Sequence, residues 1–462
     1  MRLKSFIGDR AFYSHTLRIA VPIIIQNCIT NFVNLLDNVM VGSLGTEAMS
    51  GVSIVNQFIF IFNLAIFGAV SGAGIFTAQY SGIGDTEGVR NTFRIKILTL
   101  LAIGVGGVIA FGIFGESFIG IFLHEGTDGD LALTLEKGKE YLSYTVIGLI
   151  PYAISMGYAS TLRETGETVV PMAASITSVA TNFVLNAILI FGLFGFPALG
   201  VIGAAIATSV SRFAELGVLL VWTHTHKARA AFIVGAYRSL RVPAALVKRV
   251  AIKGTPMLIN ELLWSLSVTM RNQCYSTRGL DVVAGINIAI TIVNVLNVCY
   301  MSFGNSIGII VGQTLGTGDI EKARDENKKL LAFTVAVSIG IALVEVAISP
   351  IFPLIYNTTD SVRELATFFM ITAALFTPFS ALAFASYYTL RSGGNVLVTF
   401  LFDSVYSWAV VMPTVLAFTY LTAIPIQLLY VIACTADALK FIIAIYLVKR
   451  GSWAKQLSKE LS

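Results

Sequence analysis

The sequence predicts an all-α polytopic membrane protein with about twelve transmembrane helices in two homologous six-helix lobes. Hydrophobic residues make up 56% of the 462 residues and charged residues 12%, and the mean hydropathy is +0.80, which leaves too little polar surface for a soluble protein of this size. The apolar segments are also too long and too weakly alternating for barrel strands, so the spans are expected to be helices. The chain further repeats itself at a shift of 234 residues.

The apolar segments follow one another with short polar or Gly/Pro breaks. The expected spans are residues 15–41, 52–80, 94–123, 140–163, 168–192, 198–222, 248–276, 282–312, 328–356, 362–391, 395–421 and 423–449. We therefore expect an N-lobe at 1–223, a charged linker at 224–247 and a C-lobe with a tail at 248–462.

Lysine and arginine collect in the loops on the side of the N-terminus, for example Arg90, Arg94, Lys96 and Lys248. By the positive-inside rule both termini are expected in the cytoplasm, with the chain lying in a cell membrane as a multi-pass protein. This bias explains the slightly basic composition, so no nucleic-acid partner is expected.

The repeat is carried by polar residues and glycines, not only by apolar ones. The segment QYSGIGDTEGVR at 79–90 matches QTLGTGDIEKAR at 313–324, and later the shift becomes 228, where TLRETG at 161–166 answers TLRSGG at 389–394. Six spans in each half make the two copies parallel, related by an axis near the membrane normal. In the duplicated loops we expect Asp85 and Asp319 to cap helices, and Arg90 and Arg324 to reach lipid headgroups.

The first span carries an acid, Asp37, in its interior. An ionisable residue inside a membrane span is a candidate proton or cation site. The alternative is a carboxylate at the helix end that reaches the outer headgroups. Because NVMVGSLG still follows Asp37 before the loop, we expect the side chain to face the lobe interior or an aqueous cavity.

Polar side chains in the fifth and sixth spans complete a candidate cation site. Asn182 and Asn186 are four residues apart and share one helix face, and Thr208 lies in the next span among small residues. Carboxylate, amide and hydroxyl oxygens would suit Na+, if Na+ rather than H+ is the coupling ion. The alternative is that these amides only link helices.

The second lobe has a different set of candidates for a substrate path. Glu261 follows Pro256, which can bend the helix, and Trp264 could offer an aromatic face to an organic cation. A passive polar contact of Glu261 between helices is the alternative. Arg271 stands where the first lobe has Asp37, and Asp403 or Glu345 are its expected partners.

Four further charged residues are expected to anchor spans at the membrane interface. These residues are Arg212, Glu215, Asp437 and Lys440.

Several motifs in order resemble those of the multidrug and toxic compound extrusion (MATE) transporters. They are DNVMVGSLG at 37–45, NFVLNAILIFG at 182–192, GVIGAAIATSVSR at 200–212 and GTPMLINELLW at 254–264. The resemblance implies two six-helix bundles that export organic cations or other amphipathic drug-like molecules in exchange for Na+ or H+, with no other cofactor, and we expect a monomer.

The resemblance also implies site residues. The family's first-lobe cation site has an aspartate on the first span, polar side chains on the fifth and a threonine on the sixth, which places Asp37, Asn182, Asn186 and Thr208 there. Glu261 matches an acid on the seventh span of some members, but the aspartate that accompanies it on the tenth span is absent from LFTPFSALAFASYYTLRSGG. Glu261 is then expected to serve substrate binding or protonation.

The alternatives to a transporter of this kind are a flippase and a membrane-embedded enzyme. A lipid-linked precursor flippase of the same superfamily would need basic residues inside its cavity, and only Arg271 is clearly within a span. A membrane-embedded enzyme is disfavoured, because the spans hold no HExxH pair, Ser/His constellation or carboxylate cluster with metal spacing.

Overall fold

The computed structural model describes residues 6–121, 123 and 130–457, and these residues are almost entirely helical. Among them, eleven helical segments are long and apolar enough to cross a membrane. The longer helices are α1 (Arg10–Gly42), α2 (Thr46–Gly82), α3 (Thr86–Ile121), α4 (Leu131–Thr145), α5 (Leu149–Glu164), α6 (Val169–Phe191), α7 (Val201–Thr225), α8 (Ala244–Ser276), α9 (Leu280–Thr317), α10 (Ile320–Ile348), α11 (Asp360–Ser392), α13 (Met412–Tyr420), α14 (Ile426–Ala438) and α15 (Lys440–Arg450).

The helix α8 occupies the predicted seventh span but is not one of the eleven apolar segments. Its 33 residues include Glu261 and Arg271, which lower its hydropathy. The all-helical polytopic fold predicted from the sequence is confirmed by these helices.

Prolines explain where the long helices change their winding. Pro151 has no backbone N–H, and its ring crowds the carbonyl four residues earlier. That carbonyl belongs to Ile147, and Val146–Gly148 forms a 3₁₀ turn (η2) that joins α4 to α5. Two π-helical turns, η6 (Leu401–Val405) and η7 (Ser407–Val411), likewise precede Pro413 and connect the short α12 (Val396–Phe400) to α13.

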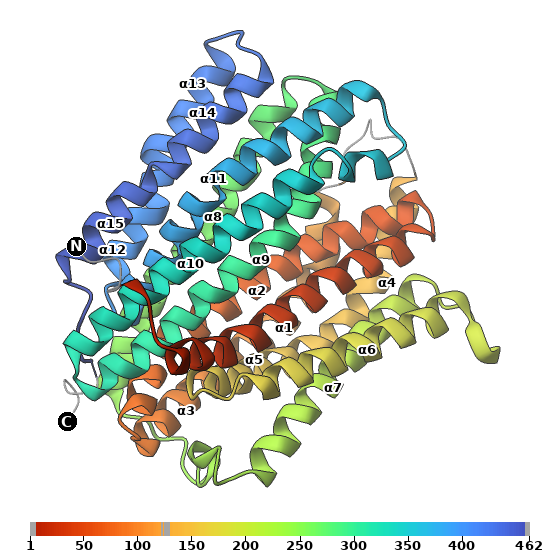
Figure 1. Cartoon of the computed structure of the whole chain (residues 1–462). Coiled ribbons are helices and arrows are strands. Elements are labelled where there is room, and N and C mark those ends of the chain that lie inside the picture. Colours follow the sequence, from red (N-terminus) through yellow and green to blue (C-terminus); the bar gives the residue numbers. More distant parts are fainter. Residues whose placement is uncertain (1–5, 122, 124–129, 458–462) are drawn as a thin grey trace. The chain divides into compact units, whose positions relative to one another are not determined.

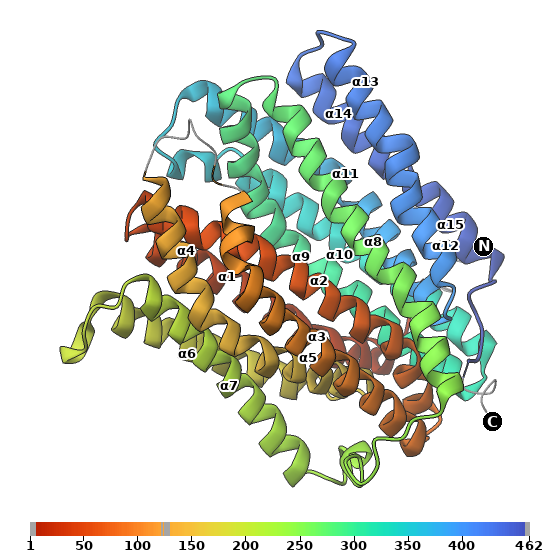
Figure 2. The same ribbon diagram turned by 180° about the vertical axis from the view of Figure 1, so that it is seen from behind.

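The contacts within the chain divide it into two compact units. The N-terminal unit comprises Ile25–Thr77 and Asp85–Gly254, and the C-terminal unit comprises Met1–Ile24, Ala78–Gly84 and Thr255–Ser462. In the N-terminal unit α6 and α7 run side by side (Figure 1, Figure 2), and Val52, Val55, Ile119 and Ile190 belong to one buried cluster.

In the C-terminal unit α9, α10 and α11 pack together (Figure 1). Buried Ile307, Val311, Leu315 and Leu390 form part of its core. A second cluster around Phe369 reaches α13 and α14.

The C-terminal unit contains a duplicated close crossing of α2 and α9. Gly82 leaves no room for a Cβ beside the carbonyl oxygen of Gln313, and Gly316 stands in the same relation to Gln79. Both pairs are related by the shift of 234 residues seen in the sequence. The Gln79 side chain also donates to the carbonyls of Ser392 (3.0 Å) and Lys455 (3.2 Å). The repeated glycines therefore let two backbones touch.

Asp85 and Asp319 in the duplicated loops cap the helices that follow them. The Asp85 carboxylate accepts a hydrogen bond from the Gly88 N–H at 2.9 Å, and Asp319 accepts one from the Lys322 N–H at 3.0 Å. Gly84 and Gly318 precede them with positive φ angles of 71° and 83°. The capping prediction is confirmed.

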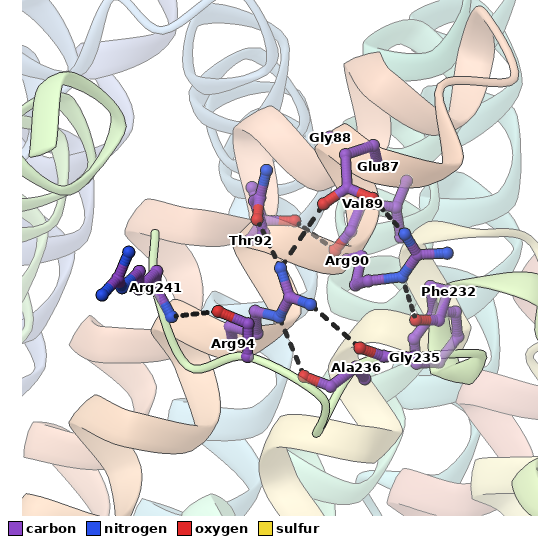
Figure 3. A network of polar contacts seen from close by, with 12 residues as sticks. Glu87, Gly88, Val89, Arg90, Thr92, Arg94, Phe232, Gly235, Ala236 and Arg241 are labelled. Carbon is purple, nitrogen blue, oxygen red and sulfur yellow. Dashed lines mark hydrogen bonds and ion pairs between the residues drawn. The ribbon is translucent and has the colours of Figure 1, made fainter. Parts of the chain in front are cut away.

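The expectation that Arg90 reaches lipid headgroups is wrong, because Arg90 holds the linker. Its Nε donates to the Phe232 carbonyl at 3.2 Å, and its guanidinium pairs with Glu87. Arg94 donates to the carbonyls of Ala236 (2.8 Å) and Gly235 (2.9 Å), as Figure 3 shows. Two arginines of α3 thus hold three carbonyl groups of the linker.

Candidate functional site

The candidate cation-site residues of the first lobe lie together in the N-terminal unit. Asp37 is on α1, Asn182 and Asn186 are on α6, and Thr208 is on α7. The Asn186 Nδ2 donates to Asp37 Oδ1 and to Asn182 Oδ1 (3.2 Å), and Asn182 Nδ2 donates to Thr208 Oγ1 (3.3 Å). A hydrogen-bonded chain of four side chains therefore joins three helices.

Local sequence explains why the chain can form. Asn182 and Asn186 are one helical turn apart on α6, so both amides project from the same face. Gly203 on α7 would clash with the backbone of Leu189 if it carried a Cβ, so α6 and α7 approach closely near these amides. The close approach allows a short side chain such as Thr208 to reach Asn182.

This chain borders a cavity of about 330 Å³ in the N-terminal unit. Helices α1, α2, α4, α5 and α7 and the turn η2 line it, with Asp37 and Thr208 in its wall. The other lining residues are Asn38, Asn56, Ile59, Phe60, Asn63, Tyr141, Thr145, Gly148, Leu149, Tyr152 and Arg212. The Asp37 side chain thus faces a polar cavity, as the sequence predicted.

The donor set is chemically suited to a small hard cation or a proton. Asn186 is only 1% exposed, and its Oδ1 is buried without a hydrogen-bond partner in the described structure. An unsatisfied buried carbonyl oxygen is costly, and a bound cation would relieve that cost. Carboxylate, amide and hydroxyl oxygens of this cluster could supply its ligands.

Sequence reasoning missed Arg212, which was expected to anchor a span at the membrane interface. Arg212 lines the cavity, its guanidinium stands 4.6 Å from the centre of the Tyr152 ring, and it pairs with Glu215 at 3.4 Å. The available signal was its spacing, because Arg212 follows Thr208 by one helical turn and shares its face. Arg212 therefore has an ion-pair partner in Glu215, and it also interacts electrostatically with Asp37.

The C-terminal unit holds a second polar cluster. Asn260 Nδ2 donates to Asp403 Oδ2 at 3.0 Å, and Ser404 Oγ donates to Asn260 Oδ1 at 2.6 Å. Lys440 pairs with Asp403 at 3.1 Å and with Asp437 at 3.0 Å. Lys440 is only 8% exposed, so the expectation that Lys440 anchors its span at the membrane interface is wrong.

Arg271 lies apart from the other two predicted substrate-path residues, Glu261 and Trp264. Glu261 interacts electrostatically with Asp403 and Arg391. Trp264 is 41% exposed. Arg271 lines a separate cavity of about 220 Å³, which neither of the other two lines. Since Arg271 follows Glu261 by ten residues, the two are about 15 Å apart along α8.

The expected ion pairs of Arg271 are also not formed. Asp403 is bound by Lys440 and Asn260, and Glu345 Oε2 accepts a hydrogen bond from Thr377 at 3.4 Å. Arg271 instead interacts electrostatically with Asp437, which lines the same cavity. The sequence could not reveal these neighbours, because they are far apart along the chain.

The chain is similar to known proteins along most of its length. The family model MatE matches residues 22–188 and 256–421. The "Probable multidrug resistance protein NorM" of Thermotoga maritima is 27% identical over 412 residues, which cover 86% of this chain and 83% of that protein. The "Multidrug resistance protein MdtK" of Edwardsiella ictaluri is 24% identical over 451 residues, which cover 96% of both chains. A solved multidrug resistance MATE family transporter in an outward-facing conformation has a TM-score of 0.85 at 18% identity, covering 97% of this chain and 98% of that one, so the two share their fold.

Proposed function

Because the chain belongs to the MatE family, whose members are membrane transporters and not enzymes, we propose that it exports drug-like organic cations or amphipathic molecules in exchange for Na+ or H+. The relatives named as multidrug resistance proteins support this choice of substrate class. We place the protein in the cell membrane as a monomer with both termini in the cytoplasm.

One observation carries the coupling part of the proposal. Asp37 lies in a cavity wall and is bound by Asn186, whose own Oδ1 is buried without a partner. We assign coupling-ion binding to Asp37, Asn182, Asn186 and Thr208. With Na+ all four oxygen-bearing side chains would be ligands, whereas with H+ the Asp37 carboxylate alone would carry the proton.

Coupling requires that the ion and the substrate favour different access states. An ion on Asp37 neutralises the one charge in this cavity that no other charged group pairs with in the described structure. A cationic substrate would then lose its electrostatic attraction to the cavity. Ion uptake at Asp37 therefore promotes release of a cationic substrate, because the ion and the substrate compete for the same carboxylate.

The test is efflux of ethidium, a fluorescent organic cation, from proteoliposomes that contain the purified full chain. A Na+ gradient alone or a pH gradient alone is imposed, which identifies the coupling ion. Asp37→Asn keeps the size of the side chain but removes its charge, and we expect it to abolish ion-driven efflux. Asp360→Asn is the matched control, because the Asp360 side chain is 90% exposed and pairs with Arg363 at 3.0 Å, away from the cavity. Efflux by Asp37→Asn at the wild-type rate would contradict the assignment.

A further inference from the structure

The last residues that the structure describes, 451–457, pack onto the C-terminal unit after α15. Trp453 is only 1% exposed and belongs to the same core cluster as Leu315 and Leu390. Its Nε1 donates to the Val448 carbonyl at 3.0 Å, and Leu457 is also buried. Residues 451–457, here called the clasp, are therefore part of the packed fold.

Two glycines after α11 make room for the clasp. A Cβ on Gly393 would collide with the Trp453 carbonyl oxygen, and a Cβ on Gly394 would lie 2.6 Å from Leu457 Cδ1. Under the shift of 228 residues the counterpart of Gly393 is Thr165, which carries a side chain. The seat of the clasp is thus a feature of the second repeat that the first repeat does not copy.

The clasp is hydrogen-bonded to both helices of the close crossing. On α2, Gln79 Oε1 accepts from the Leu457 N–H at 2.6 Å, and Gln79 Nε2 donates to the Lys455 carbonyl at 3.2 Å. On α9, the Gly316 carbonyl accepts from Gln456 Nε2 at 2.7 Å. Gln79 and Gly316 are themselves in backbone contact where α2 crosses α9, so the clasp bridges the crossing at its contact point.

The burial of Gln79 makes these bonds hard to replace. Its side chain is fully buried, and a buried amide that loses its partners is destabilised because water does not reach it. The clasp therefore favours the arrangement in which α2 and α9 touch. An arrangement in which the two helices part requires the clasp to release Gln79, Gly316 or both.

We propose that the clasp is a latch on the crossing of α2 and α9, and that Gln79 is the residue through which it holds α2. The helix α2 belongs to the first repeat and α9 to the second, and duplicated transporters alternate their access by moving one repeat against the other. The latch is bound while the crossing is closed and lets go when the crossing opens. This inference rests on the transport function proposed above and adds a gating step to it.

The test measures the opening of the crossing directly, without transport. The full chain, with its native cysteines replaced by alanine, is placed in lipid nanodiscs and spin-labelled through Ile83→Cys and Thr317→Cys, two exposed positions beside the crossing. Electron–electron resonance then gives the distribution of distances between the labels. Gln79→Leu keeps the length of the side chain but removes its hydrogen bonds, and we expect the ratio of long to short distances to rise about tenfold or more.

A second variant and a control separate the latch from a general loss of packing. Gln456→Leu cuts the latch from the clasp side, at a residue that is only partly buried, and should shift the distances in the same direction even if Gln79→Leu does not fold. The control is Gln57→Leu, the same change at an exposed position of α2. A wild-type distance distribution in either folded latch variant, or an equal shift in Gln57→Leu, would overturn the proposal. A wild-type chain that does not pump ethidium would instead refute the transport function, and the distance result would still decide on the latch.

Discussion

Replacing Glu164 with glutamine should destabilise the N-terminal unit, because it strips a buried lysine of its counter-ion. Lys96 on α3 is fully buried, pairs with Glu164 at the end of α5, and donates to Thr161 Oγ1 at 3.2 Å. Glutamine still offers an oxygen to Lys96 Nζ, but it cannot balance the charge. Removing one partner of a buried pair costs about 3–5 kcal/mol, and the retained acceptor points to the lower end.

The expected size of the effect can be expressed as a melting temperature. The N-terminal unit has about 220 residues, and about 2.1 cal/mol/K of unfolding entropy per residue gives about 0.46 kcal/mol/K. A loss of about 3 kcal/mol therefore lowers Tm by roughly 6 °C. Tm is measured in detergent at pH 7 for Glu164→Gln, Lys96→Met and the double variant.

The double variant decides whether the charge balance is the cause. Because it contains neither charge, we expect it to lie within about 1 kcal/mol of the wild type, well above either single variant. A Tm loss in the double variant equal to the sum of the two single losses would refute the reasoning. Glu140→Gln is the surface control, since Glu140 pairs with Lys137 at 2.8 Å and both side chains are partly exposed, so its loss should stay below about 1 kcal/mol.

Two further predictions follow from the fold. Gly316→Ala would place a methyl group against the Gln79 carbonyl and should lower the free energy of unfolding by about 1–3 kcal/mol. The control is Gly340→Ala on α10, where the added methyl group meets open space and should be neutral or slightly stabilising. Equal Tm values for the two variants would contradict the close crossing of α2 and α9. Arg94→Gln removes the hydrogen bonds to the carbonyls of Gly235 and Ala236 and should speed tryptic cleavage of the linker about tenfold. An unchanged cleavage rate would show that Arg94 does not hold the linker.

Some of the site followed from local sequence, and its long-range part did not. The spacing of Asn182 and Asn186 places both on one face of α6, and the structure has them hydrogen-bonded. That Asp37 meets Asn186 across 149 residues of sequence was implied only by the resemblance to a family. Periodicity describes a helix face but does not say which other helix covers it.

Charged residues near helix ends were the least predictable part of the chain. Lys96 was counted among the residues that mark the cytoplasmic side, yet it is buried against Glu164, which lies 68 residues later. Arg90 was expected at lipid headgroups and instead binds a carbonyl in the linker. A basic side chain at a membrane boundary has both water and protein within reach, and the choice depends on partners that are distant in sequence.

The duplication explains how one chain can hold two chemically different cavities. The repeat preserves features that shape the backbone, such as Pro22 with Pro256 and the glycines of the α2 and α9 crossing, because their change would disturb packing. A charge that faces a cavity is not under that constraint, so Asp37 and Arg271 could diverge on the same scaffold. In the first cavity Asp37 is the proposed ion ligand, whereas in the second Arg271 shares the wall with Asp437.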